Sequence, residues 1–206
     1  GISAPDGKVR SFDAAASGYV RSEGAGVVVL KPLSAALQHR DPIHAIILGS
    51  AVNQNGTSNG QTAPSRPAQE QVLREAYRRA QVSPGQIQYV EAHATGTRLG
   101  DAIEAFALGT VLAENRAAGS RCIVGSVKTN LGHTEAASGV ASVMKAALAL
   151  KHRQVPPNLH FQTPSPDIPF DKLPLRIPRQ LEPWPDTSGP RLAGVSAFGF
   201  GGSNAH

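Results

Sequence analysis

The 206-residue sequence contains a single cysteine, Cys122, in the middle of a short apolar stretch. A chain with one cysteine cannot form an internal disulfide, and such sparse use of cysteine is typical of a reducing compartment. The stretch also lacks the loop or helix N-terminus that activates a thiolate. We therefore expect Cys122 to be structural and the protein to be cytoplasmic.

Long hydrophobic runs and aromatic residues are also scarce. The most apolar segment, residues 136–150, is interrupted by Lys145 and is too short to span a bilayer, and no secretory signal is present. Aromatic residues make up 5% of the chain and the basic residues are scattered, so the net charge of +5 does not indicate nucleic-acid binding. Instead it suits an acidic partner. The composition predicts a soluble globular protein without membrane or nucleic-acid partners.

Alternating apolar and helical patterns predict an α/β fold. Residues 24–31 and 43–52 are rich in β-branched residues, and we expect both to be buried, neighbouring strands of one sheet. An amphipathic helix is predicted for residues 67–80, followed by a turn and a strand at 87–92. A further strand is predicted at 122–127. Helix, turn and strand in this order are typical of a parallel sheet with crossover helices.

Two further segments have recognisable signals. Residues 101–112 are predicted to form a buried helix in which Asp101 is the N-cap and Glu104 completes a capping box, so that Glu104 has a purely structural interpretation. Residues 153–190 contain ten of the sixteen prolines. We expect this region to wrap over the surface as irregular structure, with an edge strand at 175–177.

A polar turn after the 122–127 strand is the first candidate for a functional site. It holds Lys128, Asn130 and His133, and a long helix follows directly behind His133. Open α/β folds place their chemistry at the carboxyl ends of strands, and a helix N-terminus would favour a neutral imidazole. The alternative interpretation is a solvated turn lysine and a helix-capping histidine. This stretch alone does not decide between them.

Two more loops follow predicted strands, one containing His93 and one a glycine-rich loop at 198–204. His93 and His133 fit no metal-ligand spacing on a helix, and we expect no metal. Two neutral imidazoles aimed at one point would form an oxyanion hole, and a nearby lysine would help to keep them neutral. Residues 56–60 match the G-x-S-x-G pattern of a hydrolase nucleophile elbow, but no helix start follows, so we interpret them as a loop.

Several segments together resemble β-ketoacyl synthases, the condensing domains of modular polyketide synthases. The resemblance covers essentially the whole chain and is carried by EAHATGT at 91–97, VKTNLGH at 127–133 and FGFGGSNAH at 198–206, with support from residues 12–26 and 53–60. It implies a thiolase-like α/β fold of α-β-α-β-α layers, usually in a homodimer. It also implies that residues 1–31 are the end of the amino-terminal ketosynthase half and residues 32–206 the carboxyl-terminal half.

The resemblance implies decarboxylative Claisen condensation of an acyl thioester with malonyl- or methylmalonyl-acyl carrier protein. His93 and His133 would hold the extender thioester oxygen, Lys128 would support His133, and Glu104 would join the network of that lysine. The implied substrate-binding residues are Thr95 and Thr97 for the phosphopantetheine arm, Phe200 as gate of the acyl pocket, and Asn130, Phe198 and Gly201. No cofactor would bind directly, because the phosphopantetheine arm belongs to the carrier protein.

One element of this chemistry is missing. The family's cysteine nucleophile lies in the amino-terminal half, and Cys122 matches no nucleophile motif. Condensation needs that thiolate. We expect the chain to require the missing half, to be inactive alone, and to self-associate through the face that the missing half should cover. The alternative is a non-catalytic fragment or a condensing-fold protein that only shapes a partner's pocket.

Overall fold

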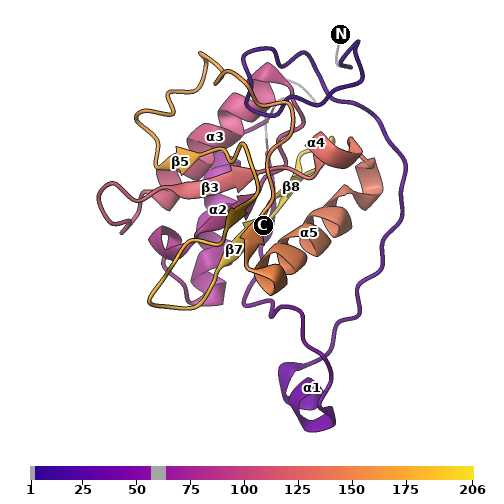
Figure 1. The fold of residues 1–206 in the computed structure, drawn as a ribbon, viewed down its shortest axis with the longest axis vertical. Coiled ribbons are helices and arrows are strands. Elements are labelled where there is room, and N and C mark those ends of the chain that lie inside the picture. Colours follow the sequence, from indigo (N-terminus) through magenta and orange to yellow (C-terminus); the bar gives the residue numbers. More distant parts are fainter. Residues whose placement is uncertain (1–2, 57–63) are drawn as a thin grey trace.

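The structure is a computed structural model that describes residues 3–56 and 64–206. Most of the elbow-like segment at 56–60 therefore lies outside the described residues. The chain forms a layered α/β body from which one extended segment projects, with a short helix at its far end (Figure 1). We call this segment, residues 27–48, the arm.

A parallel sheet lies at the centre of the body. Its four strands have the order β5 (Leu175–Arg176), β3 (Cys122–Gly125), β2 (Tyr89–Glu91) and β7 (Ala193–Val195). Tyr89 pairs with Ile123 on one side and with Ala193 on the other, and all three ladders are parallel. The predicted strands at 87–92, 122–127 and 175–177 are thus confirmed in kind, although each is shorter than predicted.

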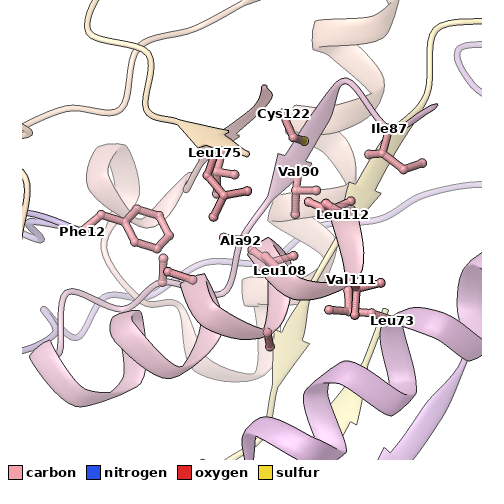
Figure 2. Close-up of a cluster of buried hydrophobic side chains, with 14 of the residues drawn as sticks. Phe12, Leu73, Ile87, Val90, Ala92, Leu108, Val111, Leu112, Cys122 and Leu175 are labelled. Atoms are coloured by element: carbon pink, nitrogen blue, oxygen red, sulfur yellow. The ribbon is translucent and has the colours of Figure 1, made fainter. Parts of the chain in front are cut away.

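Helices cover both faces of this sheet. On one face, α2 (Arg66–Ala80) and α3 (Arg98–Leu112) pack over Val90, Val124 and Leu175. Figure 2 shows Leu73 of α2 and Leu108 of α3 in one cluster with strand residues such as Val90. On the other face, α5 (Ser138–His152) covers Tyr89 and Ile123. Neighbouring residues of a strand point to opposite faces, so Tyr89 and Val90 belong to different cores.

The remaining elements are short. An antiparallel sheet joins β1 (Val52–Gln54), β9 (Ser203–Ala205) and β8 (Ala197–Phe198), and β4 (Gln154–Val155) pairs with β6 (Glu182–Pro183). The other helical segments are α1 (Leu33–His39) in the arm, α4 (Lys128–Leu131), and the single turns η1 (Pro84–Gln86) and η2 (Glu135–Ala137). The proline-rich region 153–190 is largely irregular, as predicted, but it also supplies β5 to the sheet and the buried Trp184.

The prediction of buried strands at 24–31 and 43–52 is wrong. Only Val52–Gln54 becomes a strand, and the arm exposes its apolar side chains: Val29 is 92% exposed and Ile47 62%. A strand needs a neighbour that satisfies its backbone hydrogen bonds and covers its side chains. Within the described part of the chain, no ladder pairs residues 27–48.

Two predictions about helix ends are also wrong. Helix α3 begins at Arg98, so Asp101 lies inside its first turn, where it accepts hydrogen bonds from other segments instead of capping the helix. Helix α5 begins at Ser138, five residues after His133. Gly132 before His133 and Glu135 after it have φ values of +79° and +49°, which interrupt a right-handed helix. Helix α2 was predicted correctly apart from one residue at its start.

Candidate active site

Parallel strands β2 and β3 bring the two histidine loops to the same edge of the sheet. His93 lies two residues beyond the end of β2, and α4 with Lys128 follows β3 after two residues. The glycine-rich loop reaches the same place through β8, whose Phe198 ring lies 5.4 Å from the His93 ring. The three loops singled out in the sequence therefore converge.

The two imidazoles meet edge to face, with ring centroids 5.5 Å apart and planes at 85°. His93 Nδ1 accepts a hydrogen bond from the Phe198 backbone N–H at 3.3 Å. His133 Nδ1 accepts one from the Glu135 backbone N–H at 3.0 Å. In each neutral ring the acceptor nitrogen carries no proton, so the proton is on Nε2. Both rings consequently have an Nε2–H group free to donate to a third atom.

Burial keeps both histidines neutral. It lowers the pKa of His93 well below its ordinary value, and the charges of Lys128 and a protonated His133 lower it further. Burial is also the main cause that lowers the pKa of His133 to about 4, with Lys128 second. The neutral state was predicted from a helix N-terminus directly behind His133; in the structure the single turn η2 comes before α5, and burial and Lys128 are the causes that lower the pKa.

Lys128 is a buried residue of α4, with 1% of its surface exposed. Burial lowers its pKa, and the carboxylates of Glu91, Glu104 and Asp101 oppose that effect. The interpretation of Lys128 as a solvated turn lysine is therefore wrong. This buried lysine instead interacts electrostatically with the carboxyls of the site and lowers the pKa of both histidines.

Two buried carboxylates hold the His93 loop. Glu104 accepts the backbone N–H of His93 at 2.8 Å and of Ala94 at 2.7 Å, so it does not act in a capping box. Asp101 accepts the backbone N–H groups of Gly96 at 3.1 Å and Phe12 at 2.8 Å. Burial raises the pKa of each carboxyl to about 7. The loop is thus fixed through its backbone, which leaves the imidazole of His93 free for a ligand.

Residues 9–22 thread between the two histidine loops, which sequence reasoning from the residues themselves missed. Gly18 N–H donates to Gly96 O at 3.0 Å, and the backbone of His133 bonds to Val20 and Ser22 at 2.7 and 3.0 Å. The Tyr19 ring lies 5.7 Å from the His133 ring. This segment is polar and rich in turns, so its composition predicted no role.

The remaining predicted site residues lie at different depths. Thr95 and Thr97 are partly buried, with their hydroxyls 3.1 Å apart. Asn130 is exposed on α4. Phe200 is 71% exposed and Gly201 is also exposed, in a turn whose Gly202 carbonyl accepts a hydrogen bond from the backbone of Asn55. The structure therefore brings His93, His133, Lys128, Glu104 and Phe198 together and leaves Phe200 and Gly201 at the surface.

For three charged residues beside this site, the sequence suggested no role in the site. Glu91 ends an otherwise apolar strand, Lys145 interrupts the apolar stretch of α5, and Asp101 lies in the first turn of the buried helix α3. A charge inside an apolar run is the signal that could have identified them, because such groups are rarely buried without a partner. Within residues 3–56 and 64–206, no three His, Cys, Asp or Glu side chains gather as a metal ion requires.

Three family models match successive parts of the chain. Residues 1–36 match "Beta-ketoacyl synthase, N-terminal domain", residues 44–162 match "Beta-ketoacyl synthase, C-terminal domain", and residues 164–206 match "Ketoacyl-synthetase C-terminal extension". The second of these alone covers more than half of the chain.

Whole-chain relatives agree with these matches. The chain is 56% identical over 206 residues to one component of the phenolphthiocerol/phthiocerol polyketide synthase of Mycobacterium tuberculosis, covering all of the chain and 11% of the relative. It is 52% identical over 203 residues to an erythronolide synthase of Saccharopolyspora erythraea, covering 98% of the chain and 6% of the relative.

The fold is that of solved ketosynthases. The ketosynthase from module 6 of the bacillaene synthase of Bacillus subtilis 168 superimposes with a TM-score of 0.95 at 45% identity, covering the whole chain and 37% of the solved one. The predicted thiolase-like α/β fold is thus confirmed. The chain spans little more than a third of that solved chain and about a tenth of the first relative. Among the described residues, no helix is long and apolar enough to cross a membrane.

Proposed function

The chain belongs to the β-ketoacyl synthase family, and from this premise we propose that it forms the carboxyl-terminal half of a ketosynthase of a modular polyketide synthase. In this proposal residues 32–206 make up that half and residues 1–31 end the amino-terminal half. The reaction is decarboxylative condensation: a malonyl or methylmalonyl thioester on the carrier protein loses carbon dioxide. The enolate attacks an acyl thioester on a cysteine, and the cysteine thiolate leaves.

The observation that carries the proposal is the pair of free Nε2–H groups on His93 and His133. Each Nδ1 accepts a backbone N–H and the two rings are in contact, so we propose that both Nε2–H groups donate to one bound oxygen. When the malonyl carboxylate leaves as carbon dioxide, its electron pair moves onto the thioester oxygen, and these donors stabilise the charge. Removing one preorganised donor of this kind costs about 100- to 1,000-fold in rate.

Lys128 and its carboxylates support that pair. A protonated imidazole would neutralise part of the enolate charge, but it would also lose the acceptor site that fixes its orientation. The charge of Lys128 opposes protonation of both rings, which keeps the Nδ1 acceptors in use. Glu104 holds the His93 loop by two backbone hydrogen bonds. In this proposal the four residues therefore act as one unit.

The substrate-binding roles rest on position. We assign Thr95 and Thr97, whose hydroxyls pair at 3.1 Å, to the phosphopantetheine arm of the carrier protein. Phe200 is 71% exposed, which fits a movable gate of the acyl pocket better than a fixed part of the pocket wall. Phe198 packs on His93 and borders the reacting thioester, while Asn130 and Gly201 lie on the approach. The chain itself binds no cofactor in this scheme.

In this proposal the nucleophile comes from outside residues 1–206. Cys122 is fully buried in β3, and burial raises the pKa of its thiol to about 12, which is unsuited to a thiolate at neutral pH. We assign the nucleophile to an amino-terminal ketosynthase half, which covers the apolar arm. The net charge of +5 suits an acidic carrier protein. The complete enzyme is proposed to be a homodimer in the cytoplasm.

The test is loss of carbon dioxide from malonyl-loaded carrier protein, followed by mass spectrometry with the chain alone and with an amino-terminal ketosynthase half. We expect turnover only in the combined sample. His93→Ala and His133→Ala should abolish decarboxylation but leave acylation of the partner's cysteine intact, and Cys122→Ala is the matched control that retains both. Turnover unaffected by either histidine variant contradicts the roles. A folded but inactive combined sample favours the alternative of a protein that only shapes a partner's pocket.

A further inference from the structure

A buried charged cluster lies on the opposite face of the sheet from the large core, beside the histidine loops. We define it by Glu91 of β2, Lys145 of α5 and Tyr89 of β2. Glu91 and Tyr89 are fully buried. The Tyr89 hydroxyl donates to Glu91 Oε2 at 2.5 Å. Lys145 Nζ forms an ion pair with the same oxygen at 2.8 Å, although the angles of this contact are not those of a hydrogen bond. Such a group is costly to bury, so its contacts are informative.

The second oxygen of Glu91 reaches the loop that carries Lys128. Glu91 Oε1 accepts the backbone N–H of Val127, the residue directly before Lys128. The backbone carbonyl of Glu91 accepts the N–H of Ser196 at 2.9 Å, on the segment that leads to Phe198. His93 itself follows Glu91 after one residue. One side chain and its backbone thus join all three loops of the candidate site.

The space for this cluster is built into the sheet. Gly125 of β3 pairs with Glu91, and a Cβ at this position would lie 3.3 Å from the Tyr89 hydroxyl and 3.6 Å from Lys145 Nζ. Any larger residue would push against the cluster. Lys145 in turn lies 5.9 Å from the centre of the Tyr89 ring, so its ammonium is held from two sides. The ion pair therefore also fixes α5, the helix that follows His133, against β2.

We propose that Glu91, clamped by Lys145 and Tyr89, is a positioning residue that fixes the backbone and the charge state of Lys128. The proposal rests on the proposed function of Lys128 in the ketosynthase reaction. Glu91 does not touch the substrate in this scheme and acts only through Lys128.

The charges around Lys128 predict how the cluster acts on it. Among its neighbours, Glu91 is the strongest influence that raises the pKa of Lys128, followed by Glu104 and Asp101, while Lys145 lowers it. Removing the Glu91 charge should therefore lower the pKa of Lys128, and removing the Lys145 charge should raise it. Effects of opposite sign distinguish an electrostatic role from simple loss of packing. The titratable groups around Lys128 and Glu91 are Glu104, Asp101, Lys145, Tyr89, His93 and His133.

The first experiment is an NMR titration of ¹³Cε-labelled lysine in the whole chain. Glu91→Gln should lower the pKa of Lys128 by about one pH unit or more, because a neighbouring opposite charge typically shifts a pKa by about one to three units. Lys145→Met should raise it by less, because Lys145 is the weaker of the two influences, and the double variant should lie between Glu91→Gln and wild type. Glu182→Gln is the control, because it removes a carboxylate from the 2.6 Å ion pair with Arg176, and neither residue is among the groups that shift the pKa of Lys128.

The second experiment separates this inference from the proposed function. In the ketosynthase completed with an amino-terminal half, Glu91→Gln should lower kcat for decarboxylation about 100-fold, because a small displacement of a catalytic group can cost that much. The KM for the malonyl carrier protein should stay nearly unchanged. An inactive wild-type enzyme would refute the proposed function and leave the titration to decide on Glu91.

Two results would overturn the inference. One is a Lys128 pKa that moves no further in Glu91→Gln or Lys145→Met than in Glu182→Gln. The other is an active wild-type enzyme whose kcat survives Glu91→Gln. If Glu91→Gln does not fold, Lys145→Met decides alone: an upward shift supports the role, and no shift refutes it.

Discussion

The arm and the central sheet contain similar sequences with opposite fates. Residues 27–30 read Val-Val-Val-Leu and residues 122–125 read Cys-Ile-Val-Gly, and both patterns predict a buried strand. Ile123 is fully buried between two parallel neighbours, whereas Val29 is 92% exposed and pairs with nothing in the described part of the chain. A β-branched run therefore encodes a tendency to pair, and the partner has to be supplied by something else.

The same contrast separates the parts of the proposed enzyme. The body holds the histidines, the lysine and their carboxylates in a network with buried hydrogen bonds. The arm contributes exposed apolar surface: Val27, Val29, Leu30, Leu37, Ile46 and Ile47 are each more than half exposed. The described contacts of the site thus come from the body, and in our proposal the arm is the part that an amino-terminal ketosynthase half covers.

The largest effect should come from placing one charge in each region. Val90→Asp puts a carboxylate into a site with no exposed surface and should abolish cooperative unfolding, because an unpaired buried charge costs several kcal/mol. Val29→Asp should change the free energy of unfolding by less than about 0.5 kcal/mol. Urea denaturation followed by circular dichroism measures both. Equal destabilisation by the two variants would show that the arm is packed after all.

Truncation should give a smaller difference of the same kind. Leu108 of α3 lies in the core of Figure 2, fully buried, so Leu108→Ala should cost about 2–5 kcal/mol of unfolding free energy. Leu30→Ala in the arm, where the side chain is 70% exposed, should cost less than about 0.5 kcal/mol. Thermal or urea unfolding of the two variants against wild type provides the measurement. A Leu108→Ala cost below about 1 kcal/mol would contradict the packing described for α3.

Titration of His133 tests the electrostatics of the body. Its pKa of about 4 predicts that the ¹³Cε1 resonance stays constant from about pH 8 to about 5.5. The unfolded chain binds this proton near pH 6.5. The folded pKa is depressed, so His133 contributes stability that is complete above about pH 6.5 and lost as the pH falls toward 4. A midpoint near 6.5 in the folded chain would refute the neutral imidazole.

Charges on the arm should leave stability almost unchanged and alter association instead. Val29→Lys together with Ile47→Lys should make the chain more monomeric, because the exposed apolar side chains are the surface predicted to self-associate. Sedimentation velocity at several concentrations measures the change. The matched control is Arg78→Lys on the exposed side of α2. If the double variant still associates, the surface responsible for self-association lies outside the arm.

Sequence patterns predicted the elements whose packing partners lie within this chain. Strands β2 and β3 and helix α2 were recognisable because their apolar spacing matches faces that other parts of this chain cover. The arm was mispredicted because the pattern says nothing of where a partner strand lies. The capping box failed for a related reason: Asp101 and Glu104 have the right spacing, but backbone N–H groups of the His93 loop and of Phe12 occupy their carboxylates.

The sequence predicted the chemical groups of the candidate site better than the contacts that hold these groups in place. His93, Lys128 and His133 stand in polar loops after strands, which the sequence displays directly. Their convergence agrees with the prediction, while their catalytic roles stay predictions. The contacts of residues 9–22 and the ion pair of Glu91 with Lys145 depend on three-dimensional neighbours far apart in the chain. Local patterns do not record such neighbours.

The central claim is that the body is organised by itself and that the arm needs an amino-terminal ketosynthase half. Hydrogen exchange with mass spectrometry tests it most directly, on the chain alone and after addition of that half. Amides of residues 89–91 and 122–125 should exchange slowly in both samples, and those of residues 27–30 and 43–48 should exchange fast alone and slowly in the complex. Arm amides that exchange equally in both samples, or that are protected in the chain alone, would contradict the account.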